Sequence, residues 1–375
     1  MCICVSFIIM IVSLSVCDGF RREIRAGVGA LSGDVRLAPV GTGVLSAETA
    51  DPVPIDAPYL EALRGLEGVE SVAPVVYTPG VVKTSDNIHG ILFKGVDSTL
   101  CALGPMEASI PSSFAKESGL GPGDTFVAYF IRDGKSIPRK FKVASVFRSI
   151  IDEKDKIFII CRIAELQRIN LWESGSASAF EVTLTDDWKT PAGLEAKEQE
   201  IGAVTLAWCE EDENTPTVYA TSSLRTYPAL FDWLNLIDSN VSFILILMMI
   251  VAGFNMMSGL LIMLFENIST IGILKSLGMR DRDISRLFRR IASRTVVVAM
   301  LFGNVIAVAL CLVQKYTGLI RLNPENYFVS CVPVELSPMN IAVVDILSYL
   351  VIILLVNLPL LFIKRVDPAE SMRVE

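Results

Sequence analysis

The chain has 375 residues, 52% of them hydrophobic, and its 33 Lys/Arg against 41 Asp/Glu give a net charge of −8. A composition this apolar excludes an ordinary soluble protein of the same length and indicates a membrane protein. The single histidine, His89, excludes a histidine cluster, and no GxSxG, HExxH or GxxxxGKS/T motif is present. We therefore expect no catalytic site and no ATP-binding P-loop on this chain. The eight cysteines are scattered without a CxxC pair, so neither a disulfide framework nor a metal site is expected.

The first residues predict a transmembrane helix, which we assign to 1–19. Residues 1–17 carry no charge, and we expect a true span whose cytoplasmic start precedes the printed residues. The alternative is a signal sequence, because residues 14–17 come near a lipoprotein processing box. Against this alternative, the segment lacks a basic first region, and Val16 stands where a small residue is expected before the cysteine.

Residues 20–237 predict a large α+β domain with two lobes. Residues 20–28 continue the first helix until Gly27, Gly29 and Gly33 break it. Apolar alternation, helical spacing and Gly/Pro punctuation then indicate strands at 33–40, 69–82, 90–96, 126–131, 141–147, 157–160 and 180–185, and helices at 58–66, 113–118 and 163–169. An acidic loop is expected at 210–213.

A long helix is expected to connect this domain to the membrane. Phe231, Leu234 and Ile237 lie at helical spacing and continue into the uncharged run 239–265. At about 1.5 Å per residue these 27 positions reach about 40 Å, more than the roughly 30 Å of a hydrocarbon core. We assign transmembrane helix 2 to 238–265 and expect it to link domain and membrane stiffly.

The charge distribution predicts the orientation. The loop 266–294 holds seven Lys/Arg against three acids, and short basic loops stay in the cytoplasm. Residues 18–238 hold 21 Lys/Arg against 32 Asp/Glu, so we expect the large domain on the other side. Arg21, Arg22 and Arg25 oppose this orientation, but a domain of this size is translocated largely regardless of its charge.

Two more spans follow the basic loop. Transmembrane helix 3 is assigned to 293–315, and a short extracytoplasmic loop to 316–340. Transmembrane helix 4 is assigned to 341–363, where Asp345 is the only charge, and a cytoplasmic tail to 364–375.

Residues 266–292 predict two short cytoplasmic helices. The first, 267–277, is closed by Gly278, because glycine is the usual residue just past a helix C-terminus. This helix is too apolar for free cytosol and requires a partner. The second begins near Asp281 or Asp283, and its apolar side should lie along the inner membrane surface before the third span. Contact with anionic lipid alone would also explain its basic composition.

Three segments resemble a known family. The run ENISTIGILKSLGMR at Glu266–Arg280 closely resembles the coupling-helix segment of FtsX-like ABC transporter permeases. Asp367–Arg373 resembles the C-terminal signature of that family, and Asp18–Arg25 resembles the stretch after its first span. Within the family the chain is most similar to the lipoprotein-releasing (Lol) permeases, over nearly its whole length. It departs from the pattern at Asn267, where Arg or Lys is usual, and in lacking a cytoplasmic amphipathic segment before the first span.

The resemblance implies a fold of four transmembrane helices with a large MacB-like periplasmic α+β domain between the first and second. It implies a multi-pass protein of the bacterial inner membrane that pairs with a second copy or a paralogue. It also implies a separate ATPase subunit, which would bind the ATP and Mg²⁺, so that this chain needs no cofactor. Lipoprotein cargo, membrane lipid and a periplasmic carrier are the other implied partners; nucleic acid is not. The implied ATPase-coupling residues are Glu266, Ile271, Gly272, Ile273, Leu274, Lys275, Leu277, Gly278 and Met279.

The second span is rich in methionine and offers a soft apolar surface able to accept acyl chains. Releasing three acyl chains of about 15 methylenes into water would cost on the order of 36 kcal/mol, so such a cargo must pass to an apolar cavity in a carrier. Simple packing between helices is the other interpretation of the same residues. The candidate cargo-lining residues are Phe7, Met10, Met248, Met249, Phe254, Met256 and Met257.

The loop 170–179 displays Trp172 among serines and glycines. The tryptophan could fold back on its own domain or protrude as a contact for a partner. In Lol permeases a hook-like loop recruits the carrier, and this loop lies at the matching place, although it lacks the proline of the known hook. The resemblance thus implies Arg168, Asn170 and Trp172 as carrier-contact residues.

Three other functions compete with lipoprotein release. The chain could be an FtsX-like mechanotransmission permease that regulates a cell-wall hydrolase, although such permeases generally have a smaller outer domain. It could be a MacB-like efflux permease, although those usually carry the ATPase on the same chain. A membrane-tethered sensor or adaptor would need only the outer domain and no coupling helix.

Overall fold

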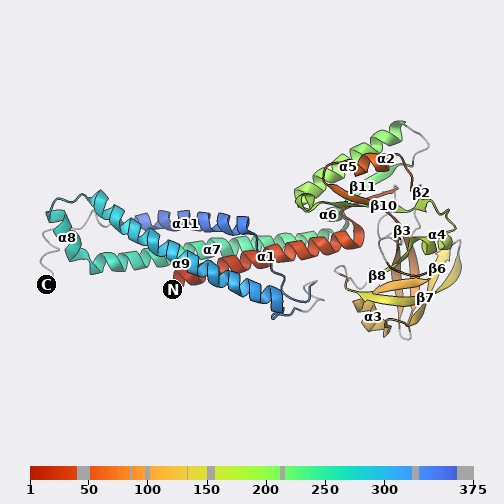
Figure 1. Ribbon diagram of the computed structural model, residues 1–375, viewed down its shortest axis with the longest axis horizontal. Coiled ribbons are helices and arrows are strands. Elements are labelled where there is room, and N and C mark those ends of the chain that lie inside the picture. The colour runs from red at the N-terminus through yellow and green to blue at the C-terminus, as the bar shows by residue number, and fades with distance from the viewer. Residues whose placement is uncertain are drawn as a thin grey trace. The chain divides into compact units, whose positions relative to one another are not determined.

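The computed structural model describes residues 1–39, 51–84, 87–97, 102–132, 134–149, 157–211, 216–322 and 329–360 (Figure 1). These residues form two compact units. The membrane unit combines Met1–Glu23 with the described residues that follow Phe231, and the outer unit comprises Ile24–Phe231.

The helices α1 (Cys2–Ser32), α7 (Pro228–Glu266), α9 (Asp281–Thr317) and α11 (Pro338–Leu360) are long and apolar enough to cross a membrane. The prediction that α1 continues past residue 20 is confirmed, but the predicted break at Gly27 and Gly29 is wrong. Gly33, with φ +69°, lies just after the helix end. A helical glycine costs about 1 kcal/mol relative to alanine. Burial of Ile24, Val28 and Leu31 along one face outweighs that cost.

The helices of the membrane unit share one apolar core. Its buried side chains come from the five helices that the structure describes in this unit, including the short α8 (Ile268–Ser276): Phe7, Met10, Met249, Ala252, Met256, Leu260, Leu264, Ile271, Ile284, Phe288, Ala292, Val296, Ile352, Val356 and Leu360. Polar contacts join α9 to α11, because the Asn304 amide donates to Asp345 Oδ2 at 2.6 Å and the Ser293 and Tyr349 hydroxyls lie 2.8 Å apart. A Cβ on Gly303 would come within 2.8 Å of Phe7 Cβ, so α1 and α9 approach closely at this glycine.

Two of the arginines that oppose the expected orientation are ion-paired within the membrane unit. Arg21 Nε lies 2.6 Å from Asp238 Oδ1, and Arg22 Nη1 lies 2.5 Å from Glu335 Oε1. The carboxylates thus offset the charges of these two arginines.

The outer unit is built on one large sheet. Its strands are β1 (Val35–Pro39), β3 (Val69–Lys83), β4 (Ile88–Val96), β5 (Glu107–Pro111), β6 (Thr125–Arg132), β7 (Lys135–Phe147), β8 (Ile157–Arg162), β10 (Ala179–Leu184) and β11 (Val218–Ser222), in the order β11-β1-β10-β3-β4-β8-β5-β7-β6. β3 also pairs with β6, with Val81 opposite Tyr129. The strands close into a ring in the order β3-β4-β8-β5-β7-β6. We call this ring the barrel.

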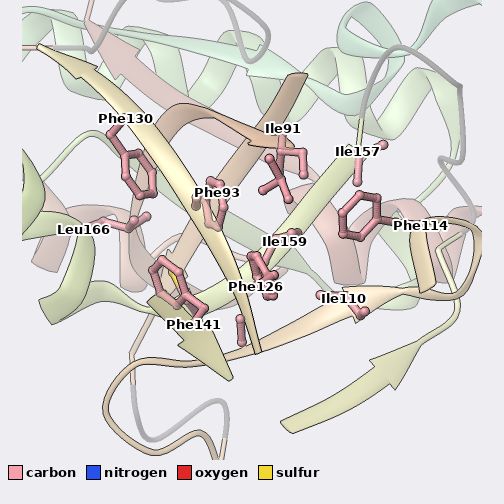
Figure 2. Packing of buried hydrophobic residues seen from close by; sticks show 14 of the residues in the cluster. Ile91, Phe93, Ile110, Phe114, Phe126, Phe130, Phe141, Ile157, Ile159 and Leu166 are labelled. Atoms are coloured by element: carbon pink, nitrogen blue, oxygen red, sulfur yellow. The ribbon is translucent and has the colours of Figure 1, made fainter. Parts of the chain in front are cut away.

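Phenylalanines fill the barrel (Figure 2). The ring centroids of Phe93 and Phe130 lie 4.9 Å apart, and those of Phe93 and Phe141 lie 5.5 Å apart in a stacked arrangement. Inward positions on β6 alternate with exposed ones, as expected for a strand that covers a core on one face only, and β7 contributes Phe141 and Val143 to the same core.

The helices of the outer unit cover the sheet and the barrel: α2 (Tyr59–Arg64), α3 (Ser112–Ser118), α4 (Ile163–Asn170), α5 (Pro191–Glu211) and α6 (Ser223–Thr226). All seven strands and the three helices predicted in this domain are present, although β7 begins six residues before the predicted strand at 141–147. Strands β5 and β11, helix α5 and the short pair β2 (Val53–Pro54) with β9 (Ser176–Ala177) were not predicted. The acidic loop expected from residue 210 is wrong at its start, since α5 runs through Glu211, and residues 212–213 lie outside the described residues.

A buried ionic network fixes the end of α1 to the sheet. Lys94 Nζ donates to the Leu31 carbonyl at 2.6 Å and lies 2.7 Å from Glu181 Oε2, with its side chain 3% exposed. The Tyr77 hydroxyl donates to the other oxygen of Glu181, and burial raises the pKa of this tyrosine well above its ordinary value. The charges of this network are therefore compensated inside the protein.

Candidate functional site

The short helix α8 lies between α7 and α9 and is delimited at both ends by its own sequence. The Asn267 side-chain amide donates to the Met263 carbonyl at 2.8 Å, at the point where α7 stops. At the other end Gly278 adopts φ +88°, and Met279 N donates to the Leu274 carbonyl at 3.0 Å. The prediction that Gly278 closes this helix is confirmed.

The helix α8 has two apolar faces. Ile271, 1% exposed, and Gly272 are buried, and Ile271 belongs to the core of the membrane unit together with Leu264 and Phe288. On other sides of the helix, Ile273 is 48% and Leu277 is 79% exposed. One face therefore fastens α8 to its neighbours and the other is available to a further molecule.

The remaining predicted coupling residues occupy intermediate positions. Leu274 and Met279 are half-buried against the same core, and Glu266 and Gly278 are exposed. Lys275 Nζ lies 3.0 Å from Asp281 Oδ1 and its side chain is 10% exposed, so its charge holds α8 to the first turn of α9. Coupling to an ATPase stays a prediction for all nine residues.

The basic segment after α8 is part of a longer helix. We expected residues 281–292 to form a helix along the membrane surface, but α9 runs unbroken from Asp281 to Thr317. The physical reason is a single buried stripe, since Ile284, Phe288, Ala292 and Val296 all face the same core. The arginines of this segment therefore lie on a helix that continues into the third span, and not on a separate helix along the membrane surface.

The predicted cargo-lining residues fall into two groups. Phe7, Met10, Met249 and Met256 are buried in the core of the membrane unit, which favours the packing interpretation for these four. Met248 and Met257 are half-buried, and Phe254 is 53% exposed. Phe254 belongs to an exposed stripe on α7, spaced by three or four residues: Phe243, Ile246, Leu247, Ile250 and Phe254.

The predicted carrier-contact residues are not equally accessible. Arg168 has a 77% exposed side chain, 3.7 Å from Glu165. The Asn170 amide donates to Thr78 Oγ1 at 3.0 Å, and Trp172 packs against the barrel core. The interpretation that Trp172 folds back on its own domain is thus confirmed. Carrier contact stays a prediction.

Leu171 was missed in the sequence and is the residue that protrudes from this loop. It is 74% exposed and adopts φ +56°, a left-handed conformation that costs a leucine about 1–2 kcal/mol. No sequence pattern predicts this exposed, left-handed leucine, because leucine is disfavoured in this conformation. Such a strained, exposed apolar residue in a loop is a candidate contact.

Groups suited to metal binding do not occur in the described part of the chain: no three His, Cys, Asp or Glu side chains are placed to hold an ion. His89 is buried and lies edge-on to Phe114, with 5.3 Å between ring centroids. It therefore serves packing.

Comparisons with known proteins agree with this arrangement. Residues 242–368 match the family described as FtsX-like permease C-terminal. The lipoprotein-releasing system transmembrane protein LolC of Xylella fastidiosa (strain 9a5c) is 20% identical over 391 residues, covering 98% of this chain and 91% of that protein. LolC of Neisseria meningitidis serogroup B is 21% identical over 401 residues with the same coverage.

Two solved structures are similar to part of the chain. The periplasmic region of MacB from Actinobacillus actinomycetemcomitans is 12% identical and covers 56% of this chain and 97% of its own, with a TM-score of 0.33. The extracellular domain of the noncanonic ABC-type transporter YknZ from Gram-positive bacteria is 11% identical and covers 50% and 99%, with a TM-score of 0.31. The expected MacB-like fold of the outer domain stays a prediction.

Proposed function

Because this chain belongs to the FtsX-like ABC transporter permeases, we propose that it is the membrane subunit of a lipoprotein-releasing transporter. A separate ATPase supplies the energy, and lipoproteins leave the inner membrane for a periplasmic carrier. The observation that carries the proposal is the similarity to LolC along 98% of the chain, outer domain included. Matches confined to the membrane helices would favour no one branch of the family.

The ATPase docks on the exposed face of α8. Ile273 and Leu277 are apolar and exposed, whereas the neighbouring Ile271 is anchored in the core shared by α7, α9 and α11. A push on α8 therefore moves the core side chains of the adjoining helices with it. Because the chain has no P-loop, ATP and Mg²⁺ bind to the partner.

The long helix α7 carries the motion. It is a single helix of 39 residues, about 58 Å long at 1.5 Å per residue, and begins in the outer unit and ends beside α8. The exposed stripe Phe243–Phe254 on this helix provides an apolar surface for acyl chains during extraction. We place the basic loop in the cytoplasm and the outer unit in the periplasm, as the charge distribution favours.

Reconstitution tests the proposal. The permease, its ATPase and a fluorescent triacylated lipoprotein are incorporated in liposomes, and transfer to a soluble carrier is measured with and without ATP. We expect transfer only with ATP and carrier together. Stimulation of a cell-wall hydrolase without transfer would instead identify a mechanotransmission permease, and ATP-driven export of small amphiphiles without transfer would identify an efflux permease.

Coupling is tested separately with Ile273→Asp and Leu277→Asp, which place a charge on the exposed face of α8. We expect both variants to lose ATPase association and transfer while remaining folded. The matched control is Leu287→Asp on α9, where an exposed apolar residue receives the same charge outside α8. Ile271→Asp is unsuitable, because burying a carboxylate in the core would unfold the site. Unchanged ATPase association in both α8 variants would contradict this docking.

A further inference from the structure

The outer domain has a basic half and an acidic half, which differ in net charge. Residues 76–170, which include the barrel, hold 13 Lys/Arg against 10 Asp/Glu, a net charge of +3. The rest of 18–238 holds 8 Lys/Arg against 22 Asp/Glu, a net charge of −14. Within the outer unit, Figure 1 shows β6 and β7 of the basic half at the opposite end from α2 and α5 of the acidic half.

The basic half presents an apolar patch on the outside of the barrel. In the register of the sheet, Tyr129 lies opposite both Val81 and Pro138, and Val127 lies opposite Lys140. The apolar side chains on this face are Ile88, Val127, Tyr129 and Ile131, between 36% and 72% exposed. The side of a strand that faces solvent normally carries polar residues, so this apolar patch indicates a contact surface.

Cations surround this patch, which we call the barrel face. Its exposed lysines are Lys83, Lys135, Lys140 and Lys142. Lys142 is paired at 3.4 Å with Glu107 of β5, whereas the strands β4, β6 and β7 contain no acidic residue. A partner that fits must combine apolar side chains with carboxylates.

The acidic half of the same domain has that chemistry. Its exposed carboxylates on and beside α2, α5 and the turn between β10 and α5 are Glu61, Glu67, Glu70, Asp186, Asp187, Glu195 and Glu200. Leu206 on α5 is exposed as well, at 43%. We call this surface the acidic face.

We propose that the barrel face of one copy docks on the acidic face of a second copy of this chain. Each copy carries both faces, so either copy can supply the barrel face of a given contact. Complementary charge sets the register, and Tyr129 and its apolar neighbours provide the buried centre. The proposal rests on the charge division and on the exposed apolar patch, and it does not depend on the cargo.

Zero-length cross-linking tests the contact, because a carbodiimide joins a lysine to a carboxylate only when the two touch. Full-length chain labelled with ¹⁵N is mixed with unlabelled chain in detergent, and the adducts are identified by mass spectrometry. We expect adducts of Lys83 or Lys140 with acidic-face carboxylates that join labelled to unlabelled copies. The Lys142–Glu107 adduct within one copy is the internal standard.

Charge reversal makes the test decisive. Lys83→Glu/Lys140→Glu alone, and Asp187→Lys/Glu195→Lys alone, should each reduce adducts between copies by roughly tenfold or more, since like charges then meet. Mixing the two variants should restore adducts, and only between one variant and the other. Lys116→Glu, an exposed reversal on α3 outside the barrel face, should change nothing.

Two results would overturn the proposal. One is the absence of Lys83 and Lys140 adducts between copies while the Lys142–Glu107 adduct forms. The other is adducts between copies that survive both reversals or fail to return on mixing.

Discussion

The membrane unit and the outer unit place polar and apolar side chains in opposite ways. In the outer unit the phenylalanines of the barrel are buried, and the surface carries the charges. In the membrane unit Phe302 and Leu354 are 64% and 70% exposed, and the polar pair Asn304–Asp345 lies inside. Removal of apolar area from water therefore stabilises the outer unit. The membrane unit is instead stabilised by close packing and by hydrogen bonds between its helices.

The largest expected effect comes from emptying the barrel. Phe141→Ala should destabilise the outer unit by about 3–5 kcal/mol, because the ring stacks on Phe93 and Phe126 with no exposed surface. Hydrogen exchange of β3, β4 and β6 in the full-length protein measures the loss. Phe302→Ala, the same change at an exposed position of the membrane unit, is the control and should cost far less. Equal losses at the two positions would contradict the contrast between the units.

The next effect tests whether buried charge in the outer unit needs its partner. Lys94→Met leaves Glu181 without its cation and should cost about 3–5 kcal/mol, measured by hydrogen exchange of β4 and β10. The double variant Lys94→Met/Glu181→Gln should recover part of the loss, because neither member of the pair is then left as a buried charge without the other. A double variant no more stable than the single one would refute this explanation.

The matching change in the membrane unit should cost less. Asn304→Leu removes the amide that donates to Asp345 and should destabilise the packing of α9 on α11 by about 1–2 kcal/mol. Thermal unfolding in detergent reports it. Asn357→Leu is the control, since within the described residues that amide donates to the Ile353 carbonyl of its own helix. A larger effect at Asn357 than at Asn304 would show that the pair between helices does not matter.

The smallest effect is a dependence on pH in the outer unit. Burial raises the pKa of Asp34, whose Oδ2 accepts the Leu184 N–H at 2.8 Å. An acid with a raised folded pKa contributes stability below its unfolded pKa of about 4, and that contribution is lost as pH rises through the folded pKa. Asp34→Asn, which stays neutral and can still accept the bond, should therefore be more stable than the parent at pH 7. The difference in unfolding temperature should shrink towards pH 4, and a difference independent of pH would contradict the assignment.

How much could be predicted from the sequence depends on what each element buries. The membrane spans were predicted from long segments almost without charge. Alternating strands such as β6 were predicted because their period of two residues indicates a single apolar face. Helix α5 was not, because its buried face mixes Leu194 and Ile201 with Lys197, Glu198 and Thr205. Closure of the barrel depends on the pairing of Val81 with Tyr129, two residues 48 positions apart, and no local pattern encodes it.

The sequence predicted where the candidate site lies along the chain, but not which side of α8 faces the protein. The sequence located α8 and its closing glycine, since both follow from local rules. It could not tell that Ile271 faces the protein and Ile273 does not, because nearly every turn of so short and apolar a helix offers an aliphatic side chain. That distinction depends on where α7 and α9 lie.

Closure of the barrel also determines where the outer domain can add a strand from another chain. Because β3 pairs with β6, β6 is not a free outer edge of the sheet. Among the described strands of the large sheet, β11 is the one left with an open side. It is only five residues long and lies six residues before α7. An extended peptide that adds to the open side of β11 therefore binds close in sequence to α7, the helix that leads into the membrane.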